Sequence, residues 1–297
     1  MKIALNTDYL QGTGAPEKYL RLMAEAGFTH VHWCHHWCTD FLYSIPEINE
    51  YKKIMKRYGL TLLDIHGTGG QKTQEKCWYS TDEYRRKAGV DLTINRMIML
   101  REMEGEGEGV LMMHPPYCRE GFTEEERKEV QPRIDAMMRT LDDLIPAMEK
   151  YDVKIALENM PADTFEVLPS YLKEFPAEWI GVTFDSGHAN MLSREGLKHI
   201  WSVKDRIEAL HLHDNDSGGD QHQPPFYGNI DWADIVKLIK ESSYRKTGRP
   251  LSFELSMRNT QFYVEDLAEK QTEESLKAYL ADAYTRCKKV VDMYEAL

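Results

Sequence analysis

Hydrophobic positions along the chain alternate between two kinds of segment. Short apolar runs, typical of buried strands, occupy residues 3–7, 30–33, 61–66, 109–114, 154–158, 180–185, 207–213 and 251–254. Segments with helical periodicity lie between them, at 16–26, 47–58, 82–104, 123–150, 194–203, 232–242 and 273–294. No linker, low-complexity tract or sharp change in composition divides the chain. The pattern therefore predicts one α/β domain over residues 1–297.

This regular alternation favours a (β/α)8 TIM barrel. A doubly wound open sheet is the structural alternative. We favour the barrel because no G-x-G-x-x-G motif follows the first strand, and the run GTGG at 67–70 is only a glycine-rich loop. In a barrel, inward-facing residues at the C-terminal strand ends line one common mouth. Side chains that are distant in the sequence are then expected to meet there.

Four of the apolar runs end in a side chain that can bind a metal ion. These residues are Glu158, Asp185, His213 and Glu254. A single carboxylate at a strand end often caps a neighbouring helix, but four such residues on four successive strands indicate a shared cation. Three carboxylates and one imidazole suit a divalent ion such as Mn²⁺, Mg²⁺, Co²⁺ or Zn²⁺.

Further candidate ligands crowd the same rim of the predicted barrel. They are His66, His114, His188, His211, Asp220 and His222. His211 has the same inward parity as His213, so it could replace His213 as the ligand or be a hydrogen-bonded histidine of the core. These groups exceed the needs of one ion. We therefore expect either two or three ions, or several residues that orient the ligands and contact the substrate.

Composition and charge narrow the range of partners. Lys and Arg are outnumbered 37 to 49 by Asp and Glu, and the net charge of −12 disfavours nucleic acid as the main partner. No apolar stretch is long enough to cross a bilayer, and the N-terminus lacks the pattern of a signal peptide, so we expect a cytoplasmic protein. The five cysteines are scattered and odd in number, which indicates free thiols and not a disulfide framework.

Several motifs resemble one known group of proteins. The runs ALENMP, GVTFDSGHAN, HLHDND with the following DQH and GNIDW, and LSFEL are similar to those of the xylose isomerase-like barrel superfamily. This superfamily includes sugar and sugar-phosphate isomerases and epimerases, inosose dehydratase and zinc-dependent apurinic endonucleases. The resemblance runs from the third predicted strand to the eighth, and it implies the same TIM barrel.

The resemblance also implies roles for individual residues. In the ketose 3-epimerases of this group one metal is held by Glu, Asp, His and Glu, which correspond to Glu158, Asp185, His213 and Glu254. The two glutamates would also be the catalytic acid and base, and His188 matches a histidine that touches substrate. Two features depart from the epimerases: the turn before Ile230 reads PPFYGN, and no Arg follows the metal histidine closely. Arg258 is a candidate substitute for that missing Arg.

These features predict a metal-dependent isomerase or epimerase acting on a small sugar or sugar phosphate. The metal would polarise a carbonyl and stabilise an enediolate, while Glu158 and Glu254 move the proton. His66 and His188 would hydrogen-bond hydroxyl groups. Three aromatic residues, Trp33, Trp37 and Phe226, are candidates to exclude water and pack against the sugar. By resemblance, a homo-oligomer is expected.

Three alternatives remain open from the sequence. The same site could eliminate water from a polyol or keto-sugar, as a dehydratase or lyase. The additional ligands match the three-zinc pattern of the endonuclease branch, which would indicate an enzyme acting at apurinic sites, although the loops after the first two strands are poor in cations. A non-catalytic barrel that binds a metal or a sugar is the third alternative.

Overall fold

Eight parallel strands form a barrel in the computed structural model, which describes residues 2–70, 74–103 and 109–297. The strands are β1 (Ile3–Asn6), β2 (His30–Trp33), β3 (Thr61–His66), β4 (Gly109–Met113), β5 (Val153–Glu158), β6 (Ile180–Asp185), β7 (Ile207–His211) and β8 (Leu251–Phe253). The strands from β1 to β7 pair in sequence order, and β1 pairs with β8. Between β7 and β8, the amide of Leu212 donates to the carbonyl oxygen of Ser252 at 3.0 Å. The predicted TIM barrel is confirmed.

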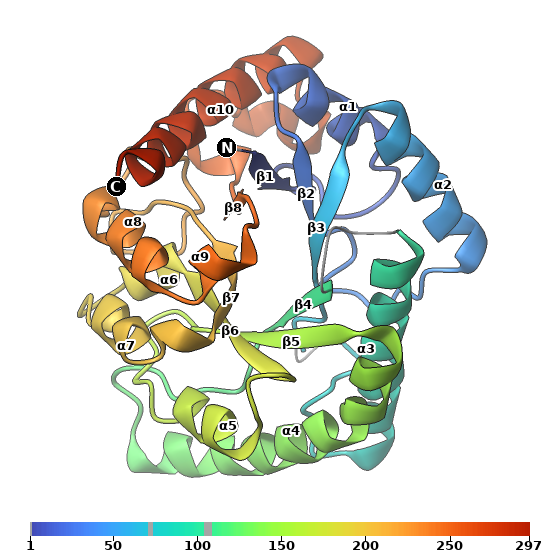
Figure 1. Cartoon of the computed structure of the whole chain (residues 1–297), viewed down its shortest axis with the longest axis vertical. Helices are drawn as coiled ribbons and strands as arrows, with labels where there is room; N and C mark the ends of the chain where they lie inside the picture. Colours follow the sequence, from blue (N-terminus) through green and yellow to red (C-terminus); the bar gives the residue numbers. More distant parts are fainter. Residues whose placement is uncertain (1, 71–73, 104–108) are drawn as a thin grey trace.

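The helices surround this ring of strands (Figure 1). The longer ones are α1 (Glu17–Ala26), α2 (Ile45–Arg57), α3 (Glu83–Glu102), α4 (Glu124–Tyr151), α5 (Leu168–Glu174), α7 (Gly196–Ser202), α8 (Trp232–Glu241) and α10 (Glu273–Ala296). Short turns of helix complete the connections: α6 (Ser186–Ala189), α9 (Tyr244–Thr247), η1 (Lys204–Arg206), η2 (Met257–Asn259) and η3 (Glu265–Lys270). Among the helices formed by the described residues, none has both the length and the apolar content needed to span a membrane.

Local sequence signals fix several of the helix ends. Helix α4 begins with a capping box, in which Thr123 and Glu126 satisfy each other's backbone amides. Ser44 and Glu47 form the same arrangement at the start of α2. Helix α1 ends at Gly27, whose φ of 106° is a left-handed conformation that favours glycine.

Strand parity explains which side chains enter the barrel. Val110, Ala156 and Ala209 form a small buried cluster of their own, apart from the main hydrophobic core between strands and helices. Because alternate residues of a strand face the same side, the residues two positions later on the same strands, such as Glu158 and His211, face the same interior nearer to the C-terminal ends.

The register brings these ends to a common level. Asp185 of β6 lies beside His211 of β7, and Glu158 of β5 lies beside Thr183 of β6. Several strands end slightly earlier than the sequence predicts: β7 ends at His211 and not at residue 213, and β8 ends at Phe253. The chain leaves the regular ladder at these points, so His213 and Glu254 lie on the segments that leave the barrel.

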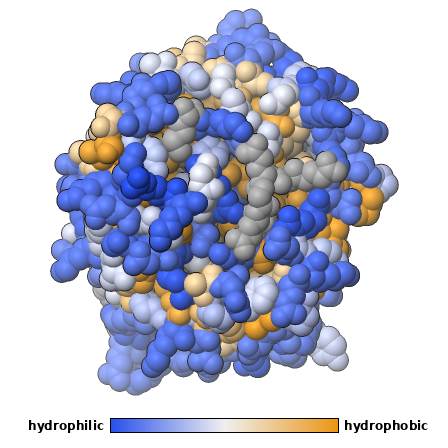
Figure 2. Space-filling view, in the orientation of Figure 1, coloured by the Kyte–Doolittle hydropathy of each residue, from blue (hydrophilic) through white to orange (hydrophobic). Residues whose placement is uncertain are grey.

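Hydrophilic side chains cover most of the molecular face seen along this axis, and apolar groups lie between them (Figure 2). This surface agrees with the 29% of charged residues in the sequence.

Candidate metal centre

The strand ends bring three of the predicted ligands together with His211. Each of the four residues Glu158, Asp185, His211 and Glu254 offers a ligand atom within 4.8 Å of those of the others. Glu158 and Asp185 are the last residues of β5 and β6, His211 is the last of β7, and Glu254 follows β8. All four side chains are buried. We refer to these four residues as the central group.

His211 lies between the two glutamates of the central group. Its Nδ1 is 2.7 Å from Oε1 of Glu158 and 2.9 Å from Oε2 of Glu254. Its Nε2 is buried and has no hydrogen-bond partner among the described residues. One imidazole nitrogen therefore faces both carboxylates at once, as a shared ligand position would require.

His213 lies in a neighbouring group and not in the central one. Its ligand atom clusters with those of His188, Asp220 and His222, and its ring stacks on that of His222 with centroids 4.1 Å apart. Its Nε2 still reaches Asp185, at 3.0 Å. Of the two histidines that the sequence left open, the geometry favours His211 as the partner of Glu158 and Glu254.

Helix α6 holds His213 in this position. Ser186 Oγ accepts a hydrogen bond from the amide of His213 at 3.0 Å and donates one to its carbonyl oxygen at 2.7 Å. The imidazole lies directly against Gly187, where an added Cβ would be 1.9 Å from Cε1 of His213. A glycine is therefore needed at position 187 for the histidine to occupy this space.

Two outer groups flank the central one. In the first, His114 Nε2 lies 2.7 Å from Oε2 of Glu158, and His66 completes the cluster. In the second, Asp220 lies between two histidines, 3.3 Å from Nε2 of His188 and 3.1 Å from Nε2 of His222. Glu158 belongs to both the central group and the first outer group. All the metal ligands that the sequence suggested thus belong to one of three neighbouring clusters.

Arg258 lies outside these clusters. It is on η2, where its guanidinium pairs with the carboxylate of Glu269 in an exposed ion pair. Its suggested role as a substitute for the epimerase Arg stays a prediction.

Neighbouring charges strongly perturb the central group. Burial alone would raise the pKa of Glu158, but His211 and His114 hold it well below its usual range. Burial acts the same way on Glu254, and His211 and His222 hold the pKa of that carboxyl well below its usual range. Burial alone would lower the pKa of His211, but Glu254 and Glu158 raise it well above its usual value. The two glutamates and the imidazole between them therefore each favour the charged form of the other.

The second outer group shows the same relationship. Burial alone would lower the pKa of His222, but Asp220 raises it to about 10. Burial would raise the pKa of Asp220, and His188 and His222 hold it well below its usual range. By contrast, burial and the neighbouring His114 lower the pKa of His66 well below its usual value. That imidazole is neutral and keeps a lone pair that can bind a cation.

The donor chemistry of the central group fits a divalent ion. Glu158, Asp185 and Glu254 are buried carboxylates whose ion-pair partners are histidines. Buried carboxylates require compensating positive charge, and here that charge comes from imidazoles that can release a proton and bind a metal instead. Oxygen and imidazole donors together suit Mn²⁺, Co²⁺, Mg²⁺ or Zn²⁺.

Two residues beneath the centre are not among the sequence-derived candidates. His32 Nδ1 lies 2.6 Å from Oδ1 of Asp64, and His32 also clusters with His211 and Glu254. The alternation of side chains along a strand could have identified both residues. His32 follows His30 by two residues on β2, and Asp64 precedes His66 by two on β3, so each shares its face with a polar neighbour.

The three candidate aromatic residues lie in different surroundings. Trp37 is near the first outer group, with its ring centroid 4.5 Å from that of His66, and its Nε1 donates to Oδ2 of Asp8 at 3.1 Å. Trp33 is fully buried in the core, where it donates to the hydroxyl of Tyr43. Phe226 packs against Trp232. Of the three, Trp37 is the one that lies beside a candidate metal ligand.

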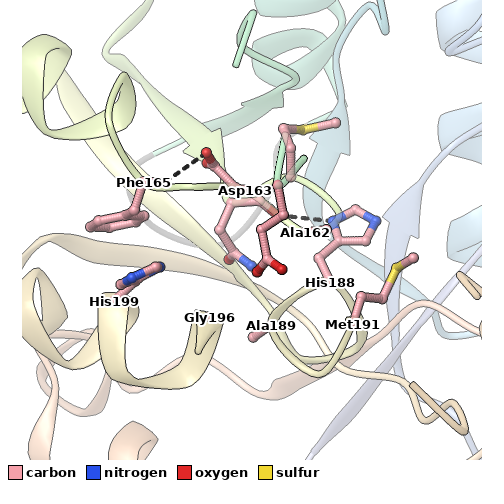
Figure 3. A pocket seen from close by; sticks show the side chains of 11 residues that line it. Ala162, Asp163, Phe165, His188, Ala189, Met191, Gly196 and His199 are labelled. Atoms are coloured by element: carbon pink, nitrogen blue, oxygen red, sulfur yellow. Dashed lines mark hydrogen bonds between the residues drawn. The ribbon is translucent and has the colours of Figure 1, made fainter. Parts of the chain in front are cut away.

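A small pocket borders the second outer group (Figure 3). His188 lies on one side of it, where its Nδ1 is 2.9 Å from the carbonyl oxygen of Asn159. Phe165 and His199 stack on the other side, with ring centroids 5.1 Å apart. Burial raises the pKa of Asp163, between these sides, to about 6. The pocket has room for about one water molecule.

Solved structures similar to this chain share its fold. A D-tagatose 3-epimerase-like protein superposes with a TM-score of 0.69 and 19% identity, covering 100% of this chain and 99% of the other. D-psicose 3-epimerase from Clostridium cellulolyticum, solved with D-tagatose, gives 0.71 and 16%, with 98% and 99% coverage. The 3-keto-D-glucoside 4-epimerase of E. coli gives 0.67 and 14%, with 97% and 99% coverage.

Sequence comparisons give higher identities. An uncharacterized protein of Sinorhizobium fredii is 28% identical over 258 residues, which is 80% of each chain. An uncharacterized protein of Methanocaldococcus jannaschii is 30% identical over 173 residues, covering 56% of this chain and 57% of the other. The family described as "Xylose isomerase-like TIM barrel" matches residues 20–282. The match extends over most of the barrel, and the chain belongs to the xylose isomerase-like TIM barrel family.

Proposed function

We propose that this protein is a divalent-metal-dependent sugar isomerase or epimerase. The observation that carries this proposal is the central group, in which Glu158 and Glu254 both face Nδ1 of His211, at 2.7 and 2.9 Å. The descriptions of the similar structures as sugar epimerases support it. The native ion is proposed to be Mn²⁺, Co²⁺, Mg²⁺ or Zn²⁺, held by Glu158, Asp185, His211 and Glu254.

The metal and the protein would divide the chemistry between them. A divalent ion at this position supplies positive charge that polarises a substrate carbonyl and stabilises the negative charge of an enediolate. The proton next to the carbonyl must be removed and returned by the protein. Glu158 and Glu254 come from β5 and the end of β8. We propose that they take the two proton-transfer roles because they are carboxylates that approach the centre from different strands.

Other residues near the mouth would position the sugar. Trp37 offers a flat apolar face beside His66, and its indole is oriented by the hydrogen bond to Asp8. His66 Nδ1 is 3.3 Å from the carbonyl oxygen of Gly67, which leaves Nε2 for a hydroxyl group or a cation. We propose that this side of the mouth binds the carbons farther from the reacting one.

Substitution of each glutamate tests the acid–base roles. The wild type is first assayed on a set of keto-sugars to find one that it converts. Glu158→Gln and Glu254→Gln are expected to reduce turnover of that sugar by at least about 10³-fold, with the circular dichroism spectrum unchanged. Glu208→Gln is the matched control, because Glu208 pairs with Lys154 at 3.0 Å and belongs to none of the metal-binding clusters. Normal turnover by either site variant would remove that residue from the mechanism. Analysis of the products separates isomerisation from dehydration.

A second candidate function follows from the three clusters together. A central group that shares Glu158 with one outer group, beside a cluster of His188, Asp220 and His222, is also compatible with three ions and phosphodiester cleavage at an abasic site. The net charge of −12 disfavours a DNA substrate. A nicking assay on an abasic duplex, with Zn²⁺ supplied, distinguishes the two functions.

A further inference from the structure

A second cavity opens beside the metal-binding clusters. It has a volume of about 270 Å³, and His114, Tyr79, Tyr117, Phe122 and Arg133 are among the residues that line it. His114 contacts Glu158 at 2.7 Å and also lines this cavity. The cavity therefore extends from the first outer group toward Arg133 on helix α4. Its size approaches the roughly 300 Å³ at which small-molecule pockets begin.

Three hydrogen-bond donors in this cavity are free among the described residues. The guanidinium of Arg133 has no ion pair or hydrogen bond in the described part of the chain, although acidic residues outnumber basic ones 49 to 37. The hydroxyl groups of Tyr79 and Tyr117 likewise make no hydrogen bond to the described residues. An unpaired guanidinium beside two free hydroxyls is a set of donors without an acceptor.

The two tyrosine hydroxyls in this cavity remain protonated. Burial raises the pKa of Tyr79 to about 12, and Arg133 opposes that rise. Burial also raises the pKa of Tyr117, with Arg119 opposing the rise and Asp163 and Asp220 adding to it. Both hydroxyls are therefore neutral donors at physiological pH.

We propose that this cavity binds an anionic substituent, a carboxylate or a phosphate, of the sugar that reacts at the central group. This inference rests on the proposed isomerase or epimerase function. Arg133 would form paired hydrogen bonds to two oxygens of the anion, and Tyr79 and Tyr117 would donate to the remaining ones. Because Arg133 would hold the anion in this cavity, it would fix which end of the sugar reaches the metal.

Three ketoses with one carbon skeleton test the inference. D-Fructose, D-fructose 6-phosphate and D-fructuronate carry a hydroxyl, a phosphate and a carboxylate at C6, so they separate the two sources of negative charge. Binding is measured by calorimetry to the Mn²⁺-supplemented full chain, with inorganic phosphate as a further probe. We expect at least one anionic ketose to bind at least about tenfold more tightly than fructose, which is the gain that a charge-assisted hydrogen bond provides.

Substitutions assign that preference to Arg133. Arg133→Gln should abolish the preference for the anion and leave fructose binding unchanged, and Arg133→Lys should retain part of it. Arg139→Gln is the matched control, because Arg139 is an exposed residue of the same helix beside Glu83. A preference that survives in Arg133→Gln would overturn the inference, as would equal binding of the three ketoses or no binding by any probe.

Hydrogen exchange separates this inference from the proposed chemistry. Anion binding that depends on Arg133, without exchange of any ketose proton with solvent, would contradict the isomerase function but leave the anion subsite standing as a binding site. Proton exchange with fructose at the same efficiency as with both anionic ketoses would support the function and overturn the subsite.

Discussion

Nδ1 of His32 and Oδ1 of Asp64 lie 2.6 Å apart inside the barrel, where both side chains are almost completely shielded from water. The ring of His32 is 4.5 Å from that of His211, and its Nε2 has no partner among the described residues. This pair connects β2 and β3 to the floor of the central group. Its position predicts a contribution to the stability of the site.

Removing one member of the pair should destabilise the protein. Asp64→Leu leaves a buried imidazole nitrogen without a partner, which typically costs about 1–3 kcal/mol. Urea unfolding of the Asp64→Leu, His32→Leu and double variants completes a mutant cycle. The double variant should lose less free energy of unfolding than the sum of the two single losses. Strict additivity would show that the two side chains do not depend on each other.

Chelation of divalent ions should lower the melting temperature. Three buried carboxylates meet in the central group, and an ion that binds only the folded state stabilises it by about 2.7 kcal/mol at one hundred times its dissociation constant. Differential scanning fluorimetry with EDTA, followed by Mn²⁺ or Co²⁺, measures the effect. The shift in melting temperature should be smaller in Asp185→Asn and unchanged in Glu208→Gln. A melting temperature that is insensitive to ions in wild type would argue against a cation site.

Substitutions of His211 and of His213 should have unequal effects on the amount of bound metal. His211 lies between the glutamates of the central group, whereas His213 belongs to the second outer group. The metal content of each variant is measured by mass spectrometry after dialysis. His211→Asn is expected to lose the most tightly bound metal equivalent. His213→Asn should retain it and should lose only an additional, weaker equivalent if one exists. The reverse order would assign the central position to His213.

The free energy of unfolding should depend on pH through Asp163, which lines the pocket of Figure 3. Burial raises the pKa of this carboxyl from 3.8 to about 6, with Glu166 adding to the rise and His188 opposing it. A pKa that is higher in the folded state favours folding below the unfolded value, and this contribution is lost as the pH rises through 6. The change from 3.8 to about 6 corresponds to about 3 kcal/mol.

The Asp163→Asn variant isolates this effect. Its free energy of unfolding, relative to wild type at the same metal content, should increase between pH 5 and pH 8, because only the wild type must bury a charged carboxylate at the higher pH. Urea unfolding at both pH values measures the difference. A difference that does not change with pH would show that Asp163 keeps its ordinary pKa in the folded protein.

Much of the fold follows from the sequence because strands and helices have different hydrophobic periods. The eight apolar runs mark the eight strands, and the side chains that end them, such as Glu158 and Asp185, are the ones that converge at the mouth. Barrel geometry makes this step reliable, since parallel strand ends meet wherever the sheet closes.

The remaining features depend on information that the sequence pattern lacks. His211 and His213 have the same parity, and only the end of the β7 ladder at His211 separates them into two clusters. Asp64 and His32 come from different strands, so their pairing depends on register. Arg133 is a helical residue with an ordinary sequence context, and only the packing of α4 beside the loop after β4 directs it into a cavity.

Hydrogen exchange at the carbon next to a ketose carbonyl is the strongest test of metal-assisted proton transfer by this protein. The Mn²⁺-loaded protein is incubated in D₂O with the neutral and anionic ketoses, and NMR follows loss of that proton. We predict deuterium incorporation into at least one sugar by the loaded wild type, and none after chelation or in Glu158→Gln. No exchange with any sugar by protein shown to hold its metal, or equal exchange after chelation, would rule out the proposed metal-dependent proton transfer.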